Sequence, residues 1–242
     1  AKEKFSPDFF LYENNKSAAR PIKDQIAQSL GYPLQYINSS LVSAQNRPRF
    51  YVHNIPNVEL PKDRNLHISD ILEQEPVDKR FYFTDKTYQS VQKILARSKA
   101  KGLGFRSGII SDFEHSKFLN LDAHYHKGPD GKRTMFQVGG QCRMATPIEA
   151  ERLQTLPDNY TAGISNTQRY KCLGNGWTAE VIKHILSYAH VPADEEIIVL
   201  SMYDGIATGR YCFDSLGYKN VKYYAYEIDK YAIQVAIKNY PD

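Results

Sequence analysis

The stretch from residue 197 to residue 228 constrains the fold of this chain more than any other. The apolar run at 197–200, Ile-Ile-Val-Leu, is too short for an isolated helix and suits a buried parallel strand. A turn of small residues at 201–209 leads into a helical segment that we expect to stop at Gly217, and a second strand at 221–226 ends on Glu227. This order predicts the first half of a nucleotide-binding β-α-β unit.

The glycine spacing in the turn narrows the class of ligand. Gly205 and Gly209 would let the backbone approach a ligand closely, and Glu227, about 20 residues further on, would accept both hydroxyls of a ribose. The spacing Gly-x-x-x-Gly differs from the Gly-x-Gly-x-x-Gly that binds a pyrophosphate, which disfavours a dinucleotide. A nucleoside without a diphosphate, such as S-adenosylmethionine, fits better. The alternative is a glycine turn that serves only close packing in a parallel sheet.

Length and composition describe an ordinary globular protein. The 242 residues, 42% hydrophobic and 24% charged, suit one large α/β domain or one domain with a smaller lobe. No apolar run approaches the roughly 20 residues of a membrane span and no signal peptide opens the chain, so we expect a cytoplasmic protein. Three cysteines without metal-ligand spacing favour a reducing compartment and no metal site. The chain starts with Ala1, which indicates a processed start or a segment of something longer.

An acidic residue near the N-terminus is a candidate proton donor. The apolar residues 9–11 predict a strand that carries Glu13, Asn14 and Asn15 at its C-terminal end, where open parallel sheets bind ligands. A partly desolvated glutamate there would have a raised pKa and would donate a proton. The alternative is that Asn14 or Asn15 caps a helix and that Glu13 lies in solvent. A helix is expected at 21–30, with Gly31 as its stop.

A pair of arginines precedes the strand expected at 50–52. Arg47 and Arg49 are two residues apart on extended chain, so their side chains would point the same way. Together they would bind a carboxylate, a phosphate or a base oxygen. The alternative is a solvated basic edge.

The region 57–141 is polar and rich in proline and glycine, which predicts a separate lobe. From residue 86 to residue 106 it holds basic residues and no acid, a pattern that usually marks a solvated helix face. The flexible basic and aromatic loop at 102–106 that follows also suits phosphate contacts and groove entry on nucleic acid. The candidate DNA contacts are Lys99, Lys101 and Arg106.

Regular structure returns after residue 145. Thr146 is expected to cap a helix with Pro147 at its first position and Glu149 at its third, close to a capping box, and this helix would end before Pro157. The segment Gly-Asn-Gly-Trp-Thr at 174–178 precedes an amphipathic helix whose inward residues would be Val181, Ile182, Ile185, Leu186 and Ala189. That helix leads through a short linker into the β-α-β unit.

Six of these segments together resemble the C5-cytosine DNA methyltransferase family. The segments at 203–209 and 227–232 resemble the family's first, cofactor-binding motif and its second motif. Residues 13–15 resemble its Glu-Asn-Val motif apart from the third residue, and 45–49 fit its Gln-x-Arg-x-Arg motif. The helix at 146–157 looks like the one that follows the target-recognition lobe, and 174–177 are similar to the final motif, which closes on the cofactor.

The order of the motifs departs from the family. Family members usually begin with the cofactor loop and finish with the Gly-Asn motif, whereas here the Gly-Asn helix runs directly into the cofactor loop. The chain therefore resembles a circular permutation, which is physically reasonable because the termini of compact domains often lie close together. A tandem fusion would look the same locally.

The family's nucleophile is a cysteine in a Pro-Cys loop between the second motif and the Glu-Asn-Val motif. In this sequence that interval falls beyond Asp242 and before Ala1. None of Cys142, Cys172 and Cys212 follows a proline, and we expect all three to be structural. The nucleophile would then lie in a segment outside this sequence, lie on a companion polypeptide, or be absent.

The resemblance implies a fold and a domain division. The fold would be α/β, a Rossmann-like sheet of the S-adenosylmethionine-dependent methyltransferases with helices on both faces, plus a smaller irregular target-recognition lobe. Residues 1–56 and 142–242 would form the catalytic core and 57–141 the lobe. The setting would be prokaryotic or phage-type restriction-modification.

The resemblance also implies a reaction and its residues. A methyl group would pass from S-adenosylmethionine to C5 of a cytosine flipped out of double-stranded DNA, after a thiolate has added to C6. Glu13 would protonate N3, and Arg47 and Arg49 would contact O2 and order the loops around the base. The expected cofactor site comprises Tyr203, Asp204, Gly205, Ile206, Thr208 and Gly209 for the methionine part, Glu227 for the ribose, Ile228 for the adenine face, and Asn175, Gly176 and Trp177 for the far wall.

Two other classes remain open. A non-catalytic regulatory subunit that binds DNA or cofactor would lack the cysteine altogether. An unrelated nucleotide-dependent enzyme, such as an oxidoreductase, would prefer NAD to S-adenosylmethionine. An RNA substrate would use the same chemistry.

Overall fold

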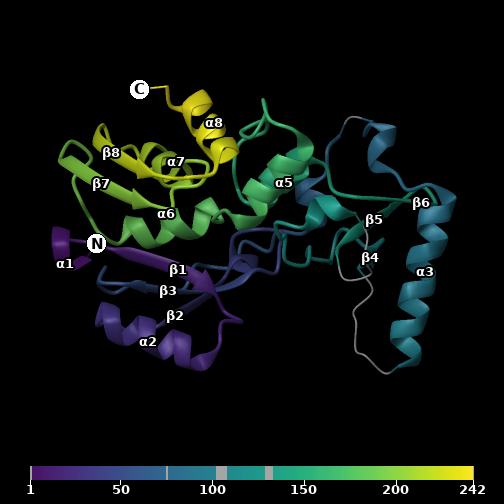
Figure 1. Cartoon of the computed structure of the whole chain (residues 1–242), viewed down its shortest axis with the longest axis horizontal. Coiled ribbons are helices and arrows are strands. Elements are labelled where there is room, and N and C mark those ends of the chain that lie inside the picture. The colour runs from purple at the N-terminus through teal and green to yellow at the C-terminus, as the bar shows by residue number, and fades with distance from the viewer. Residues whose placement is uncertain (1, 75, 102–107, 129–132, 242) are drawn as a thin grey trace.

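The computed structural model describes residues 2–74, 76–101, 108–128 and 133–241 (Figure 1). The helices are α1 (Lys2–Phe5), α2 (Arg20–Leu30), α3 (Asp85–Ala100), α4 (Pro147–Leu153), α5 (Asn166–Asn175), α6 (Ala179–Ser187), α7 (Thr208–Ser215) and α8 (Lys230–Asn239). The strands are β1 (Leu11–Asn15), β2 (Gln35–Asn38), β3 (Pro48–His53), β4 (Ile109–Ile110), β5 (Met135–Val138), β6 (Gln141–Arg143), β7 (Glu196–Met202) and β8 (Asn220–Tyr226). Short 3-10 turns occupy Ser39–Leu41, Ile68–Ile71, Lys79–Phe81 and Tyr125–Lys127.

The predicted β-α-β unit is confirmed. The apolar run lies in β7, which pairs in parallel with β8 in the register Val199↔Tyr223, and α7 connects the two strands. Gly217 follows α7 with a φ of 83°, a left-handed conformation that ends the helix. The helix α8 after the second strand was not predicted from the sequence. Its start is set by the Asp229 side chain, which accepts a hydrogen bond from Tyr231 N at 2.8 Å.

The N-terminal sheet differs from the expectation. It has the order β1-β3-β2 and is antiparallel throughout, so Glu13 lies in the middle of β1, opposite Tyr51, and not at the end of a parallel strand. The helix-cap alternative is also wrong, because α2 begins after Ala19 without a side-chain cap. The direction of β1 relative to its neighbour is set by the long-range pairing with β3, which an apolar run does not encode. The helix expected at 21–30 and its stop at Gly31, where φ is 73°, are confirmed.

The C-terminal helices follow the sequence patterns closely. In α4, Thr146 accepts from Glu149 N and the Glu149 carboxylate accepts from Thr146 N, which completes the predicted capping box. In α6, Val181, Ile182 and Ile185 are buried as predicted. Helix α5 was not predicted, and the Gly-Asn segment expected as a turn forms its last residues.

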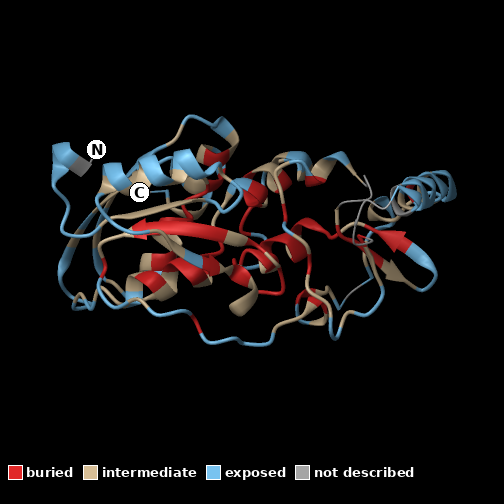
Figure 2. Cartoon of the chain, turned by 90° about the horizontal axis from the view of Figure 1, so that it is seen from below, coloured by how far each residue is buried: buried red, intermediate tan, exposed pale blue. Residues whose placement is uncertain are grey.

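One hydrophobic core joins most of the chain. It combines Ile37 and Tyr51 from the N-terminal sheet, Phe118 and Leu121 from the region 57–141, and side chains of α4, α5 and α6. Figure 2 shows these buried segments along the centre of the molecule, with α3 exposed at one end. The region 57–141 therefore holds both an outlying helix and part of the shared core. Among the described residues, no helix combines the length and the hydropathy that a bilayer crossing requires.

Among the residues that the structure describes, nothing covers one face of the parallel pair. Four side chains of β7 and β8 lie on this face and are largely exposed. Their exposed fractions are 67% for Ile198, 47% for Met202, 56% for Tyr224 and 57% for Tyr226. On the opposite face, the Tyr223 side chain packs against the start of α7. Within the described ranges, each of these strands pairs only with the other. Other elements normally cover both faces of a parallel sheet, so this face lacks the covering layer that is expected for it.

Candidate active site

A pocket of about 260 Å³ lies at the C-terminal ends of β7 and β8. It gathers nine of the predicted cofactor residues, namely Asn175, Gly176, Trp177, Tyr203, Asp204, Gly205, Ile206, Thr208 and Glu227. Lys171, Cys172, Ser201, Asp229 and Ala232 complete its lining. The pocket therefore brings together the end of α5, the turn after β7 and the acid that follows β8. We call it the loop pocket.

The turn after β7 is held in an unusual backbone conformation. Gly205 has a φ of 64°, and Tyr203 and Ala207 on either side of it have a φ of 60°. Left-handed conformations at residues other than glycine are uncommon and tend to occur at functional sites. The Glu227 carboxylate secures this turn, because it accepts from Gly205 N at 2.8 Å and from the backbone N–H groups of Ile228 and Asp229.

Two predicted cofactor residues do not line the loop pocket. A side chain at Gly209 would place its Cβ 2.4 Å from the Tyr223 hydroxyl, so the packing role that we kept as an alternative applies to this glycine. Gly205, in contrast, has open space around it. Ile228 is 96% exposed and lies next to Glu227, outside the lining.

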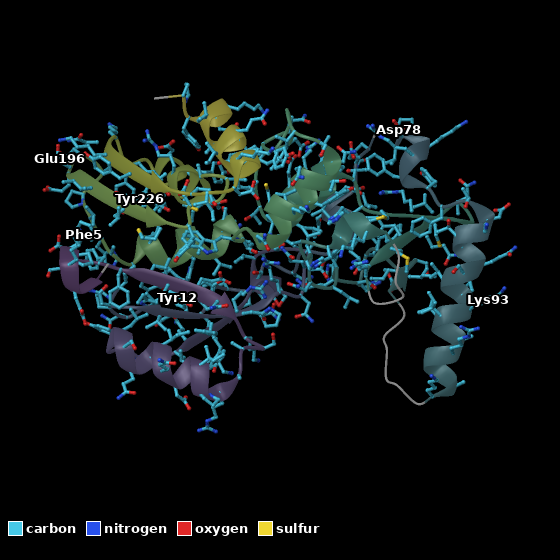
Figure 3. All side chains as sticks on the ribbon, in the orientation of Figure 1. Phe5, Tyr12, Asp78, Lys93, Glu196 and Tyr226 are labelled. Atoms are coloured by element: carbon cyan, nitrogen blue, oxygen red, sulfur yellow. The ribbon has the colours of Figure 1, made fainter. Side chains whose placement is uncertain are left out.

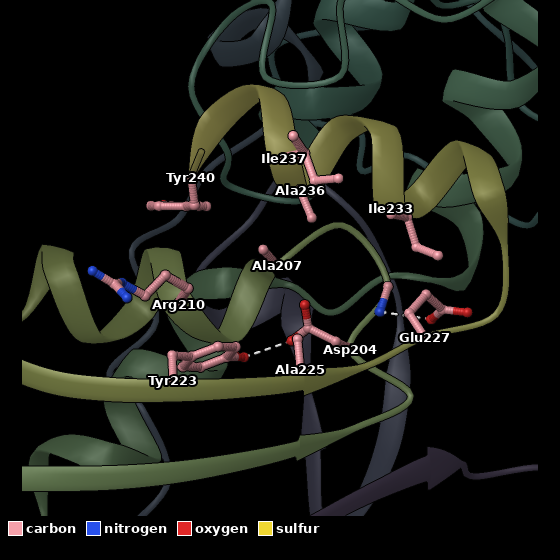
Figure 4. A pocket seen from close by; sticks show the side chains of 11 residues that line it. Asp204, Ala207, Arg210, Tyr223, Ala225, Glu227, Ile233, Ala236, Ile237 and Tyr240 are labelled. Atoms are coloured by element: carbon pink, nitrogen blue, oxygen red, sulfur yellow. Dashed lines mark hydrogen bonds between the residues drawn. The ribbon is translucent and has the colours of Figure 1, made fainter. Parts of the chain in front are cut away.

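A second hollow of about 290 Å³ lies on the other side of the same turn, between α7, α8 and β8 (Figure 4). It shares Asp204, Gly205 and Glu227 with the loop pocket. Asp204 is fixed there because its carboxylate accepts a hydrogen bond from the Tyr223 hydroxyl at 2.6 Å. Burial, with Asp204 as a further cause, raises the pKa of Tyr223, so this hydroxyl remains a donor at neutral pH.

Glu13 and Arg49 form a largely buried ion pair. Arg49 Nε and Glu13 Oε1 lie 2.9 Å apart, and the side chains are 10% and 15% exposed. Burial raises the pKa of Glu13, and this effect is opposed by the charges of Arg49 and Arg47 and by a hydrogen bond from the Trp177 indole. The prediction of a partly desolvated glutamate with a raised pKa is thus confirmed.

Arg47 is occupied by the chain itself. Its guanidinium group donates to the carbonyl oxygens of Gly174, Gly176 and Leu121 at 3.0, 2.8 and 2.5 Å, and to Asn120 Oδ1 at 3.1 Å. The residue is 3% exposed, and burial lowers its pKa to about 10. The alternative of a solvated basic edge is therefore wrong. The expectation that Arg47 orders the surrounding loops agrees with these bonds, and Arg49 is the arginine beside Glu13.

Sequence reasoning missed Asn120. Its side-chain oxygen accepts from Arg47 at 3.1 Å and lies 3.5 Å from Arg49 Nη2, so one amide serves both guanidinium groups. It also missed Gln154, which donates to the Leu173 carbonyl at the end of α5. Asn120 belongs to no motif, and Gln154 lies in the segment at 146–157, to which we assigned no chemical role.

Arg47 connects the ion pair to the loop pocket. It donates to the carbonyl oxygen of Gly176, a lining residue, and it shares Asn120 Oδ1 with Arg49. The candidate acid, the arginine beside it and the cofactor turn, which come from opposite ends of the sequence, therefore meet in one region. The resemblance described above predicts this juxtaposition.

Of the candidate DNA contacts, Lys101 lies at the end of the molecule that holds α3. Lys101 is exposed directly after this helix, the side chain of Lys99 lies outside the described parts, and Arg106 lies outside the described residues. Lys86, Lys93 and Arg97 on α3 are also exposed, and Figure 3 shows Lys93 projecting away from the core. Their spacing of seven and four residues places them on one helix face.

The cysteines are buried and free. Burial raises the pKa of Cys142, and it raises those of Cys172 and Cys212 to about 12. Cys172 lines the loop pocket, where the charges of Asp229 and Glu227 add to the effect of burial. All three are therefore protonated thiols at neutral pH.

Comparison with solved structures defines the class of fold. The chain is similar to the Entamoeba histolytica methyltransferase EhMeth, with a TM-score of 0.55 and 20% identity over 76% of this chain and 62% of that one. At this identity the likeness establishes the fold alone, and it confirms the predicted methyltransferase fold class.

Sequence comparison defines the family. The model of the C-5 cytosine-specific DNA methylase family matches residues 2–189, and the chain belongs to this family. It is 31% identical to the type II methyltransferase M.NlaX of Neisseria lactamica over 197 residues, which cover 74% of this chain and 61% of the relative. It is 27% identical to the DNA (cytosine-5)-methyltransferase DRM2 of Oryza sativa subsp. japonica over 218 residues, covering 87% of this chain and 36% of that protein. The chain thus spans about three-fifths or less of these curated relatives.

Proposed function

We propose that this chain forms the cofactor- and base-binding part of a DNA (cytosine-5)-methyltransferase, which transfers a methyl group from S-adenosylmethionine to C5 of a cytosine flipped out of double-stranded DNA. The observation that carries the proposal is the connection that Arg47 makes between the loop pocket and the ion pair of Glu13 and Arg49. A candidate proton donor and a candidate nucleoside site thereby lie next to each other.

The loop pocket fits the proposed cofactor in charge and shape. Asp204, Glu227 and Asp229 outnumber Lys171 in its lining, which suits a ligand with a sulfonium and an ammonium group. Gly205 leaves open space where the methionine part would lie, and the exposed Ile228 offers an apolar surface beside Glu227 for the adenine. When bound, the cofactor supplies an electrophilic methyl group.

Glu13 would act on the pyrimidine. A neutral carboxyl group donates a proton to N3 as negative charge develops on the ring, and burial of Glu13 favours that neutral form. Arg49 Nε holds the carboxylate in a fixed orientation, and the rest of its guanidinium group is the candidate donor to O2. Arg47 would not contact the base; it would hold the carbonyl groups of Gly174 and Gly176 at the end of α5.

The proposed reaction needs a thiolate that adds to C6. Burial raises the pKa of Cys172 and Cys212 to about 12, which keeps both thiols protonated at neutral pH. We therefore propose that a segment with a Pro-Cys loop, from the same gene product or a companion chain, supplies the nucleophile. The uncovered face of β7 and β8 and their free edges within the described ranges are the surface on which this segment would dock.

We propose a permuted motif order for the chain. The match to the family model ends at residue 189, just before β7, so it leaves out the β-α-β unit. The alignment with rice DRM2 covers 87% of the chain, a larger share than the family model matches. The structure is compatible with this order, because Cys212 in α7 donates through its thiol to the Ala179 carbonyl at the start of α6. The two helices on either side of the junction thus pack as one unit.

DNA would lie along α3. Lys86, Lys93 and Arg97 form one exposed basic face, and Lys101 continues it beyond the helix end. Such a row contacts phosphates without reading sequence. The second candidate function, a non-catalytic subunit that binds DNA or cofactor, is favoured by the three protonated cysteines.

Calorimetry with S-adenosylhomocysteine and with NAD tests the cofactor assignment. We expect binding of S-adenosylhomocysteine, weakened at least tenfold by Asp229→Asn together with Glu227→Gln. The pocket loses two of its three negative charges, and the turn loses one of the two carboxylate oxygens that accept from it. A preference for NAD, or no effect of these changes, would contradict the assignment. The exposed pair Glu114→Gln and Asp112→Asn serves as the control.

A further inference from the structure

Lys171 is the only cation among the described residues that line the loop pocket. It lies in α5, one helical turn before Asn175, so the two residues share a face of this helix, and both line the pocket. Lys171 precedes the segment at 174–177 that resembles a family motif, so the resemblance assigns it no role. One wall of the pocket therefore carries a positive charge that no motif explains.

The acids of the loop pocket already have partners within the chain. Asp204 accepts from the Tyr223 hydroxyl at 2.6 Å. Glu227 accepts from three backbone N–H groups at distances of 2.7–2.8 Å, and Asp229 accepts from Tyr231 N at 2.8 Å at the start of α8. Each carboxylate is therefore held in place without a ligand.

Lys171 has no such partner. Within the part of the chain that the structure describes, its ammonium group forms neither a hydrogen bond nor an ion pair, although the residue is partly buried. Removing a charged donor from water is unfavourable unless it is paired. Lys171 does not stabilise the end of α5 either, because the last turn of this helix contains no basic residue.

The side chain of Asn175 is in a similar state. It is exposed, and it makes no hydrogen bond with another described residue. Its amide group offers two donors, and the ammonium group of Lys171 offers three. The α5 wall of the pocket therefore holds two neighbouring side chains whose donors the described chain does not use.

We propose that Lys171 binds the carboxylate of the methionine part of the cofactor and that the Asn175 amide is a second donor to it. The proposal rests on the proposed function, because it takes S-adenosylmethionine as the ligand of the pocket. It deepens that function because it names the residue that lets the pocket select a nucleoside bearing an amino acid over a bare nucleoside.

The charges of the pocket explain why the carboxylate needs this contact. Asp204, Glu227 and Asp229 attract the sulfonium and ammonium groups of the cofactor, but they repel its carboxylate. Lys171 supplies the opposing attraction through a charge-assisted hydrogen bond. The ligand in turn supplies the acceptor that Lys171 lacks.

A phosphate is the other anionic group that suits a lysine, and the same acids disfavour it. A phosphate monoester carries a charge of about −1.5 to −2 at pH 7 and brings no positive charge with it. The carboxylate of the cofactor, in contrast, is accompanied by an ammonium group on the same carbon. Three acids and one lysine therefore fit a zwitterion better than a nucleotide.

Calorimetry on the 242-residue chain with two ligands tests the contact. S-adenosylhomocysteine has the carboxylate, whereas its decarboxylated analogue keeps the ammonium group and lacks only the carboxylate. We expect the wild type to bind the analogue about tenfold more weakly, the usual effect of losing one hydrogen bond between charged groups. Lys171→Met should weaken binding of S-adenosylhomocysteine by a similar factor and abolish the preference for it over the analogue.

Matched variants separate the contact from packing and from net charge. Lys219→Met removes the same charge at an exposed residue outside the pocket lining and should leave the preference unchanged. Lys171→Arg keeps the charge and should retain a preference for S-adenosylhomocysteine. An equal loss of affinity for both ligands in Lys171→Met, with the preference intact, would show a structural role only and overturn the inference.

The wild type alone also decides the question, whether or not a variant folds. Equal binding of the two ligands would overturn the inference while leaving the proposed function standing. Tighter binding of adenosine 5′-monophosphate than of S-adenosylhomocysteine would assign Lys171 to a phosphate and overturn it as well. Failure to bind S-adenosylhomocysteine at all would contradict the proposed function and this inference together.

Discussion

Glu13 and Arg49 are diagonal partners across two antiparallel strands, with Glu13 Oε1 and Arg49 Nε 2.9 Å apart. In the pairing of β1 with β3, Glu13 stands opposite Tyr51 and Arg49 stands opposite Asn15. Residues two apart on a strand share a face, so the acid and the arginine are held on one face by backbone pairing alone. The ion pair then fixes the direction in which the carboxyl group points.

Replacing the acid tests its chemical role. Glu13→Gln keeps the shape and still accepts from Arg49, but it removes the proton to be donated. We expect the complete gene product to lose methyl transfer by about 100-fold or more, which is the usual contribution of general acid catalysis, with little change in affinity for S-adenosylhomocysteine. Initial rates of methyl transfer measure this. Normal rates in Glu13→Gln, or an equal loss in the exposed control Glu114→Gln, would contradict the assignment.

Arg47 is expected to act through the end of α5, whose carbonyl groups it holds. Arg47→Lys retains the charge but cannot reach its four acceptors at once, so carbonyl groups near the end of α5 lose their donor. We expect a loss of about 2–3 kcal/mol in the free energy of unfolding and weaker binding of S-adenosylhomocysteine. Urea denaturation and calorimetry check both. Arg20→Lys, at a side chain that is 90% exposed, should change neither, and an unchanged Arg47→Lys variant would refute the role.

The ion pair of Arg143 and Glu149 provides a purely structural prediction. Both bonds measure 2.7 Å, and the side chains are 3% and 0% exposed. Glu149→Gln leaves a buried arginine without its counter-charge, so we expect a loss of about 3–5 kcal/mol in the free energy of unfolding. Asp24→Asn in the exposed pair with Arg20 should cost about 0–1 kcal/mol. Equal effects of the two changes in urea denaturation would contradict the structure.

The raised pKa of Glu13 has a consequence for stability. Because the folded state holds this proton more tightly than the unfolded chain, the stability from the neutral carboxyl is fully present below the ordinary glutamate pKa. It is lost as pH rises through the higher pKa of the folded state. Glu13→Gln should therefore gain stability relative to the wild type between pH 4 and pH 7 in urea denaturation. A difference that stays constant or changes in the opposite direction would show that burial does not dominate.

The basic face of α3 predicts a salt-dependent effect. Lys93→Ala combined with Arg97→Ala removes two phosphate contacts, so DNA affinity should fall for all sequences alike. The slope of log affinity against log salt should become shallower by about 1.8. Fluorescence anisotropy with a DNA duplex at several salt concentrations measures both quantities. Lys219→Ala, at an exposed residue between α7 and β8, is the control, and an unchanged slope in the double variant would place DNA elsewhere.

The elements that the sequence predicted well are those with local patterns. The apolar run of β7, the turn at Gly205 and the capping box at Thr146 each encode a conformation within a few residues. Helix α5 escaped prediction because its buried residues, among them Tyr170 and Leu173, lie among polar ones without a clear apolar stripe.

The sequence predicted which residues belong to the candidate active site better than it predicted what their side chains contact. The motif placed Arg47 and Arg49 together, but only the fold shows that Arg47 reaches carbonyl groups at residues 174 and 176, more than 120 positions away. The direction of β1 and the role of Asn120 are likewise set by long-range packing. Gly209 looked like a ligand contact, yet its neighbour is the hydroxyl of Tyr223 on β8, the strand that follows α7.

The central claim is that this chain holds the cofactor and the proton donor while another segment brings the nucleophile. Transfer of a labelled methyl group from S-adenosylmethionine to cytosine C5 in duplex DNA tests it most directly, with the 242-residue chain alone and with the complete gene product or its companion chain. We predict that the chain alone binds S-adenosylhomocysteine but transfers no label, and that the complete assembly transfers it. Transfer by the chain alone, or no transfer by the complete assembly, would contradict the account.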